Sequence, residues 1–238
     1  MVEKLSEFLP VPRLKKNKEG FYSWETDYPE SIGRFHSYFG NFSILVRAYV
    51  YIRMLGDKGL KAMTRNAIIN ANYLKHLLQH VYDIPFSEGT LHEFVASGVR
   101  QKEKGVKVLD IAKALLDYGF HAPTVSFPVT GTLMIEPTES ENLAELNRFC
   151  DAMISIKNEI DEVVEKRVKP EESVLKNAPH TIFSLTDENW KFSYTKEKAV
   201  FPLDFVKQNK FWPSVRRVDD AFGDRNLHCS CAPIEDYQ

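Results

Sequence analysis

Gly40, Asn41 and Ser43 stand directly before a helical pattern, a place where residues of these types can bind an anion. Free backbone N–H groups and the positive end of the helix dipole favour negative charge at such a start. An Asn or Ser N-cap with nothing bound explains the same residues. On spacing alone, the capping interpretation is favoured.

A second group of residues gathers carboxylates between a predicted strand and a predicted helix. Glu136, Glu139 and Glu141 lie within six positions, and the spacing of Thr138 and Glu141 predicts a capping box for the helix. Carboxylates in a first helical turn interact favourably with the helix dipole, which is a sufficient explanation for them. They would face a substrate only where a cleft opens beside the end of the strand.

His92 and Glu93 form a third group, on a strand predicted over Thr90–Ser97. Alternation along a strand places their side chains on opposite faces, so only one of them can face the core. A structural histidine is favoured over a functional one.

Cys229 and Cys231, with His228 beside them, resemble half of a metal site. A structural zinc ion needs four ligands, and Cys150 lies far away in a helical pattern. Two redox-sensitive thiols are therefore favoured, and no metal site is expected. The sequence also lacks a P-loop, GxGxxG, GxSxG, HExxH and paired CxxC motifs, so these residues alone identify no reaction.

The helices and strands that must position these residues are predicted from hydrophobic periodicity and from the places where Gly and Pro interrupt it. The first 40 residues are interrupted by Gly and Pro, and the lysines of 15–18 with the following aromatic residues predict a short strand or a hairpin arm. Helices are expected at Asn41–Leu55, Gly59–Val81, Val108–Tyr118 and from residue 138 to about Arg167, and strands at Thr90–Ser97, Thr124–Phe127 and Thr132–Ile135.

This order predicts an α/β fold, an α+β sandwich with helices packed on one face of a small sheet. We expect a lead-in segment over 1–40, a small α/β domain over 41–168 and an extended C-terminal tail over 169–238. In that tail, Arg216 and Arg217 with Asp219 and Asp220 predict an exposed ion-pair turn.

Composition excludes several classes of protein. Among 238 residues, 31 Lys and Arg stand against 33 Asp and Glu, a formal net charge of −2 that does not favour nucleic acid or an anionic membrane. Mean hydropathy is −0.33, and no apolar run approaches the roughly 20 residues of a membrane helix. Three cysteines make no disulfide framework, which favours a reducing, intracellular setting.

Several stretches together resemble one enzyme family. The sequence is similar to the carboxy-terminal part of glycine dehydrogenase (decarboxylating), the P-protein of the glycine cleavage system. The similar stretches are Ser31–Ile52 (SIGRFHSYFGNFSILVRAYVYI), Ala67–Leu74 (AIINANYL), His92–Ser97 (HEFVAS), Leu109–Ser140 (LDIAKALLDYGFHAPTVSFPVTGTLMIEPTES), Lys198–Pro213 (KAVFPLDFVKQNKFWP) and Arg217–Tyr237 (RVDDAFGDRNLHCSCAPIEDY).

The resemblance implies the small C-terminal domain of the aspartate-aminotransferase-like fold, in an enzyme that uses pyridoxal phosphate (PLP). That enzyme decarboxylates glycine and transfers the aminomethyl group to the lipoyl arm of H-protein. The resemblance further implies that Gly40, Asn41 and Ser43 bind the cofactor phosphate, and that Cys229 and Cys231 are redox candidates. It implies a substrate or lipoyl channel lined by His92, Glu136, Thr138 and Glu139.

The sequence departs from the family at the lysine that forms the Schiff base, because it contains no His-Lys step before a glycine-rich loop. We therefore expect no catalytic residue and no covalently held PLP in this chain. The expected partners are the missing N-terminal large PLP domain and lipoylated H-protein, in a homo- or hetero-dimer, without nucleic acid or membrane.

Alone, the chain is expected to be inactive, and the alternative is a non-catalytic interaction or regulatory module derived from the enzyme. The first 30 residues lack a transit-peptide pattern, which favours a bacterial cytoplasm. A mitochondrial matrix origin stays open if the start is artificial.

Overall fold

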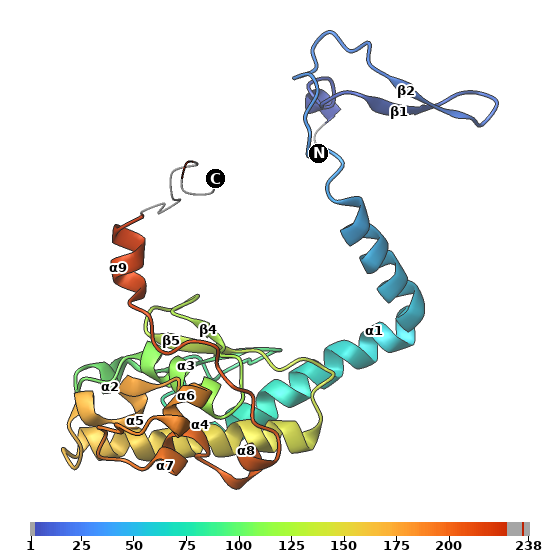
Figure 1. Cartoon of the computed structure of the whole chain (residues 1–238). Helices are drawn as coiled ribbons and strands as arrows, with labels where there is room; N and C mark the ends of the chain where they lie inside the picture. Colours follow the sequence, from blue (N-terminus) through green and yellow to red (C-terminus); the bar gives the residue numbers. More distant parts are fainter. Residues whose placement is uncertain (1–2, 228–234, 236–238) are drawn as a thin grey trace. The chain divides into compact units, whose positions relative to one another are not determined.

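The computed structural model describes residues 3–227 and residue 235, which fall into two units (Figure 1). The N-terminal unit is Met1–Lys61 and the C-terminal unit is Ala62–Gln238. The domain boundaries expected after residues 40 and 168 remain predictions.

The N-terminal unit contains the predicted hairpin arm. After a short 3-10 helix, η1 (Glu3–Leu5), strands β1 (Arg13–Lys16) and β2 (Tyr22–Glu25) pair in antiparallel fashion. The Asn17 side chain closes the turn by accepting a hydrogen bond from the Phe21 N–H at 2.8 Å. Asn is common in such turns because its short side chain can bond to the backbone nearby.

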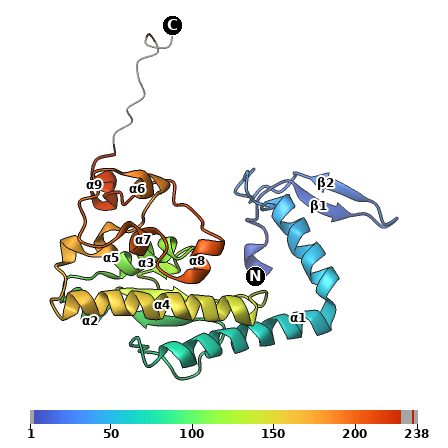
Figure 2. The same ribbon diagram turned by 60° about the horizontal axis from the view of Figure 1, so that its bottom comes forward.

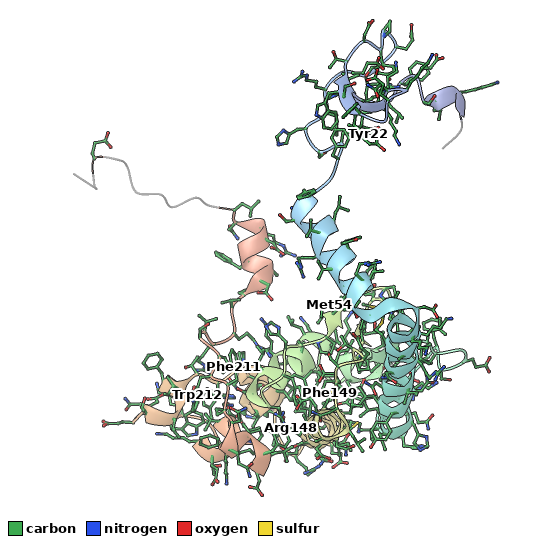
Figure 3. The ribbon with its side chains drawn as sticks, turned by 90° about the vertical axis from the view of Figure 1, so that its right-hand side faces the viewer. Tyr22, Met54, Arg148, Phe149, Phe211 and Trp212 are labelled. Carbon is green, nitrogen blue, oxygen red and sulfur yellow. The ribbon has the colours of Figure 1, made fainter. Side chains whose placement is uncertain are left out.

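Helix α1 (Phe42–Leu78) starts in this unit and is interrupted at Gly56, as the sequence predicted. Gly56 has φ 60° and ψ −172°, a left-handed conformation that glycine adopts without a Cβ penalty. All the buried residues of α1 lie after this break. Before it, the apolar side chains are exposed except for the half-buried Leu55, and Met54, labelled in Figure 3, is 81% exposed.

The C-terminal unit is built on a three-stranded antiparallel sheet of order β3-β5-β4. Its strands are β3 (Phe94–Ser97), β4 (Thr124–Val125) and β5 (Thr132–Ile135). Between and after them come helices α2 (Val99–Lys102), α3 (Val108–Asp117) and α4 (Leu143–Val164). Figure 2 shows α4 running beside the second part of α1.

One hydrophobic core joins these helices to the sheet. The β3 residues Phe94 and Ala96 and the β5 residues Leu133 and Ile135 are buried in the same cluster as Leu74 and Leu78 of α1 and the apolar residues of α3 and α4. Alternation along the strands accounts for this shared inner face. The expected mixed α/β architecture is therefore confirmed.

The chain after residue 169 differs from the extended tail that was expected. It forms η2 (Pro170–Glu172) and the short helices α5 (Val174–Asn177), α6 (Ile182–Thr186), α7 (Lys196–Val200), α8 (Asp204–Gln208) and α9 (Asp220–Arg225). Leu175 and Ala178 are fully buried in the core. Segments this short carry too little periodicity to be predicted. In the described part of the chain, no helix has the length and apolar content needed to cross a membrane.

Candidate functional site

A pocket of about 340 Å³ opens in the C-terminal unit where β5 ends and α4 begins. Apolar side chains from α1, β5, α4 and the residues after α3 form its floor, and polar side chains line the rest. The apolar residues include Leu74, Phe120, Met134, Ile135, Leu146 and Phe149, and the polar residues are His121, Thr124, Glu136, Thr138, Glu141 and Glu145.

The loop from Glu136 to Glu141 is held against α1 by one side chain. The Asn70 amide donates to the backbone carbonyls of Thr138, at 2.9 Å, and Glu141, at 3.2 Å. These bonds link residues about seventy positions apart in the chain and fix the backbone of the pocket's polar side.

Helix α4 is capped by Asn142, so the predicted capping box of Thr138 and Glu141 is wrong. The Asn142 side chain accepts from the Glu145 N–H at 2.9 Å. The Thr138 hydroxyl lies 2.7 Å from the Ser140 hydroxyl instead. Asn is as good an N-cap as Ser or Thr, and the helix simply begins four residues later than the pattern suggested.

Glu136, Glu141 and Glu145 give the pocket an acidic side. Glu145 forms an ion pair with Arg148, whose guanidinium also lies over the rings of Phe120 and Phe205 at 5.2 and 4.7 Å. Figure 3 shows Arg148 next to Phe149 on α4. An apolar floor beside carboxylates suits a ligand with an aliphatic stem and a cationic or hydrogen-bond-donating head.

The side chains of His92 and Glu93 both lie close to that of Glu136. The prediction that His92 and Glu93 point to opposite faces is therefore wrong. The two residues precede β3 in an irregular segment, where strict strand alternation does not apply. Nε2 of His92 is 3.7 Å from Oε2 of Glu93. One ligand atom each from His92, Glu93 and Glu136 lies within 4.8 Å of the others.

Of the four predicted channel residues, Glu136 and Thr138 line the pocket together. The side chain of His92 does not line the pocket but lies close to that of Glu136. Glu139 is half-buried in the same loop but is not among the residues that line the pocket. Cys229 and Cys231 lie outside the described residues.

Gly40, Asn41 and Ser43 belong to the N-terminal unit, at the start of α1. Asn41 accepts from the Ile44 N–H at 3.3 Å and so acts as an N-cap. A Cβ added at Gly40 would meet no atom within 4 Å, so the space beside this glycine is open. The assignment of these three residues to the cofactor phosphate stays a prediction.

Two buried polar networks were missed by the sequence analysis. In the first, Nδ1 of His180 lies 2.8 Å from the carboxylate of Asp117, and Nε2 lies 3.0 Å from the Tyr194 hydroxyl. In the second, the carboxylate of Asp110 accepts from Arg217 and, at 2.7 Å, from Lys176. The expected ion-pair turn at Arg217 is therefore wrong, because this side chain reaches into the domain.

A buried acid lies on α4. Burial raises the pKa of Glu159 to about 8, while hydrogen bonding to Tyr118 and the charge of Lys198 oppose that rise. The Tyr118 hydroxyl donates to Oε1 of Glu159 at 3.0 Å. Oε2 of Glu159 is buried without a hydrogen-bond partner among the described residues. The acid lies in the core, where burial disfavours its charged form.

Comparisons with known proteins relate this chain to one enzyme. The sequence model of the family "glycine dehydrogenase, C-terminal domain" matches residues 63–180. Glycine dehydrogenase (decarboxylating) from Flavobacterium johnsoniae is 52% identical over 99% of this chain and 24% of its own length. The human mitochondrial enzyme is 50% identical over 84% of this chain and 20% of its own length.

A solved structure has a similar fold. The crystal structure of glycine decarboxylase (P-protein) of the glycine cleavage system, in inhibitor-bound form, matches with a TM-score of 0.50 and 16% identity. The match covers 65% of this chain and 37% of the other. The chain thus spans about a quarter of the length of the curated relatives it matches.

Proposed function

Because the model of the glycine dehydrogenase C-terminal domain family matches residues 63–180, we propose that this chain acts as the carboxy-terminal portion of a PLP-dependent glycine dehydrogenase (decarboxylating). In that enzyme, glycine is decarboxylated and the aminomethyl group passes to the lipoyl arm of H-protein. The chain would supply the small domain of an aspartate-aminotransferase-like fold. It would be inactive without the large domain.

The similarity to glycine dehydrogenase carries this proposal, and the exposed first part of α1 supports it. Ile44, Leu45, Tyr49 and Ile52 are each more than half exposed, although their spacing is that of a buried helix face. An apolar surface of this kind marks a contact with another protein segment. We assign that contact to the N-terminal three quarters of the enzyme, since the chain spans only about a quarter of its relatives.

The acidic pocket supports a place for this chain beside the path of the substrate. Glu136 and Thr138 lie at its polar side, with His92 and Glu139 nearby in sequence or space. In the assembled enzyme, these residues would line the channel taken by glycine or the lipoyl arm. The carboxylates would attract the amino group of the transferred unit, and the apolar floor would hold the aliphatic arm.

PLP would be held by the large domain, where it supplies an electron sink for the decarboxylation. Gly40, Asn41 and Ser43, at the start of α1, would contact its phosphate in the assembled enzyme. Cys229 and Cys231 remain redox candidates. The further partners would be lipoylated H-protein and a second catalytic half, in a bacterial cytoplasm or a mitochondrial matrix.

Co-purification tests whether the first part of α1 contacts the rest of the enzyme. The chain is produced together with the N-terminal region of the Flavobacterium johnsoniae relative that it does not match, and the complex is isolated through a tag on that region. We expect the two pieces to co-purify and the Leu45→Glu/Ile52→Glu variant to be lost. Arg53→Ala, an exposed change on the same helix, should be retained.

A derived interaction module is the second candidate, and the same exposed surface favours it. It predicts that the N-terminal region is not retained at all, while the chain still associates through Leu45 and Ile52 with a different protein. Retention of the N-terminal region that does not depend on these two side chains would contradict our assignment of the contact.

A further inference from the structure

Two carboxylates meet at one end of the paired strands β3 and β5. Phe94 of β3 pairs with Ile135 of β5 in antiparallel fashion. Glu93 immediately precedes Phe94 and Glu136 immediately follows Ile135. His92 precedes Glu93 in the chain, and its Nε2 lies 3.7 Å from the Glu93 carboxylate.

Like charges held close together repel each other. A divalent cation between the two carboxylates would balance their charge. One ring nitrogen of His92 and one carboxylate oxygen from each glutamate already lie within 4.8 Å of one another. Three donors that converge in this way can be shared by one metal ion.

We propose that His92, Glu93 and Glu136 bind a divalent transition-metal ion of the zinc class. One imidazole with two carboxylates suits zinc and its neighbours, whereas calcium and magnesium prefer oxygen ligands throughout. Zinc bonds of about 2.0–2.2 Å put neighbouring ligands of a tetrahedron about 3.4 Å apart. The His92–Glu93 separation of 3.7 Å is close to that value, and side-chain rotations would bring Glu136, whose ligand atom lies within 4.8 Å of the other two, into the same range.

Three protein ligands leave one coordination position open for water or an anionic ligand. The side chains of His92 and Glu93 are 53% and 39% exposed, which gives an ion free entry. Since Glu136 also lines the pocket, the ion would lie at the edge of that pocket. The proposal depends only on these three residues and does not rest on the proposed enzymatic function.

Cobalt titration of the full chain tests the site, because tetrahedral Co²⁺ has visible absorption bands. A Cys229→Ser/Cys231→Ser background removes thiolates that would also bind the metal. We expect one Co²⁺ per chain, displaced by Zn²⁺. His92→Ala, Glu93→Gln and Glu136→Gln should each lower the affinity at least about 10-fold, since even outer-shell changes cost 10–100-fold.

His80→Ala is the matched control, an exposed histidine outside the cluster, and should bind Co²⁺ as the parent does. Circular dichroism of each variant establishes that it is folded. The proposal is overturned if the parent shows no saturable uptake, or if His92→Ala binds as tightly as the parent. It is equally overturned if His80→Ala weakens binding as much as the three ligand changes do.

Discussion

His180 and Asp117 form a buried pair that ties the chain after α5 to helix α3. Nδ1 of the imidazole lies 2.8 Å from Oδ2 of the carboxylate, and the His180 backbone N–H donates to Oδ1 at 2.7 Å. The two side chains are 0% and 2% exposed. A carboxylate removed from water to this degree depends on such donors for its stability.

Replacement of His180 by Ala should lower the free energy of unfolding by about 3 kcal/mol, since it leaves a cavity and a buried carboxylate that has lost a partner. Urea denaturation followed by fluorescence measures the change. The exposed His80→Ala should stay within about 0.5 kcal/mol of the parent. Equal midpoints for the two variants would show that the pair does not stabilise the fold.

Arg217 should matter far more to stability than its neighbour Arg216. Arg217 donates to buried Asp110 and to the backbone carbonyls of Ala178 and Leu175, so Arg217→Ala should cost about 3 kcal/mol. Arg216 is exposed over the Phe192 ring, a contact worth about 0.5–1 kcal/mol. Chemical denaturation of both variants measures the difference, and similar losses would contradict the role given to Asp110.

Both networks show why α3 could be found from the sequence and its partners could not. Val108, Ile111 and Leu115 mark the helix by their spacing, and α3 begins and ends within a residue of the prediction. Asp110 and Asp117 lie among these apolar residues and are as buried as they are. Their cationic and imidazole partners come from 63 to 107 positions away, a separation that no local pattern reports.

The free energy of unfolding should fall as pH rises, because Glu159 is buried. An acid with a folded pKa of about 8 and an unfolded value near 4.5 holds its proton in the folded state only, between those two values. Its contribution is intact below about pH 4.5 and is lost as pH rises to about 8, by up to about 1.4 kcal/mol per pH unit.

The Glu159→Gln variant tests this effect, because the amide cannot ionise. Relative to the parent, it should gain stability between about pH 5 and pH 8 in urea denaturation. Glu165→Gln, at an exposed ion pair with Arg167, should follow the pH profile of the parent. A constant difference between Glu159→Gln and the parent across this range would rule out a protonated Glu159.

A substitution at Glu141 tests the proposed channel separately from the metal site, because Glu141 lines the pocket and is not one of the proposed metal ligands. In the assembled enzyme, Glu141→Gln should lower kcat/KM for H-protein about 10-fold, the equivalent of one charge-assisted hydrogen bond. PLP absorbance should be unchanged. Glu88→Gln, an exposed change that does not line the pocket, is the control. An unchanged kcat/KM would place the channel elsewhere.

The acidic pocket itself was only partly predictable. Glu136 and Thr138 were assigned from a resemblance, and the structure puts both in the pocket. His121 was missed because the segment after α3 has no periodic pattern that fixes its direction. His92 and Glu93 were predicted to point to opposite faces, because the predicted strand began four residues before β3. Strand alternation does not apply to residues that precede the strand.

Restored activity is the most direct measurement of the central claim, that this chain is the C-terminal portion of the enzyme. The chain is mixed with the N-terminal region of the Flavobacterium johnsoniae relative, PLP and lipoylated H-protein, and the glycine-dependent exchange of labelled CO₂ is followed. We predict exchange in the complete mixture and none with either piece alone. A complex that assembles and binds PLP but stays inert would contradict the account.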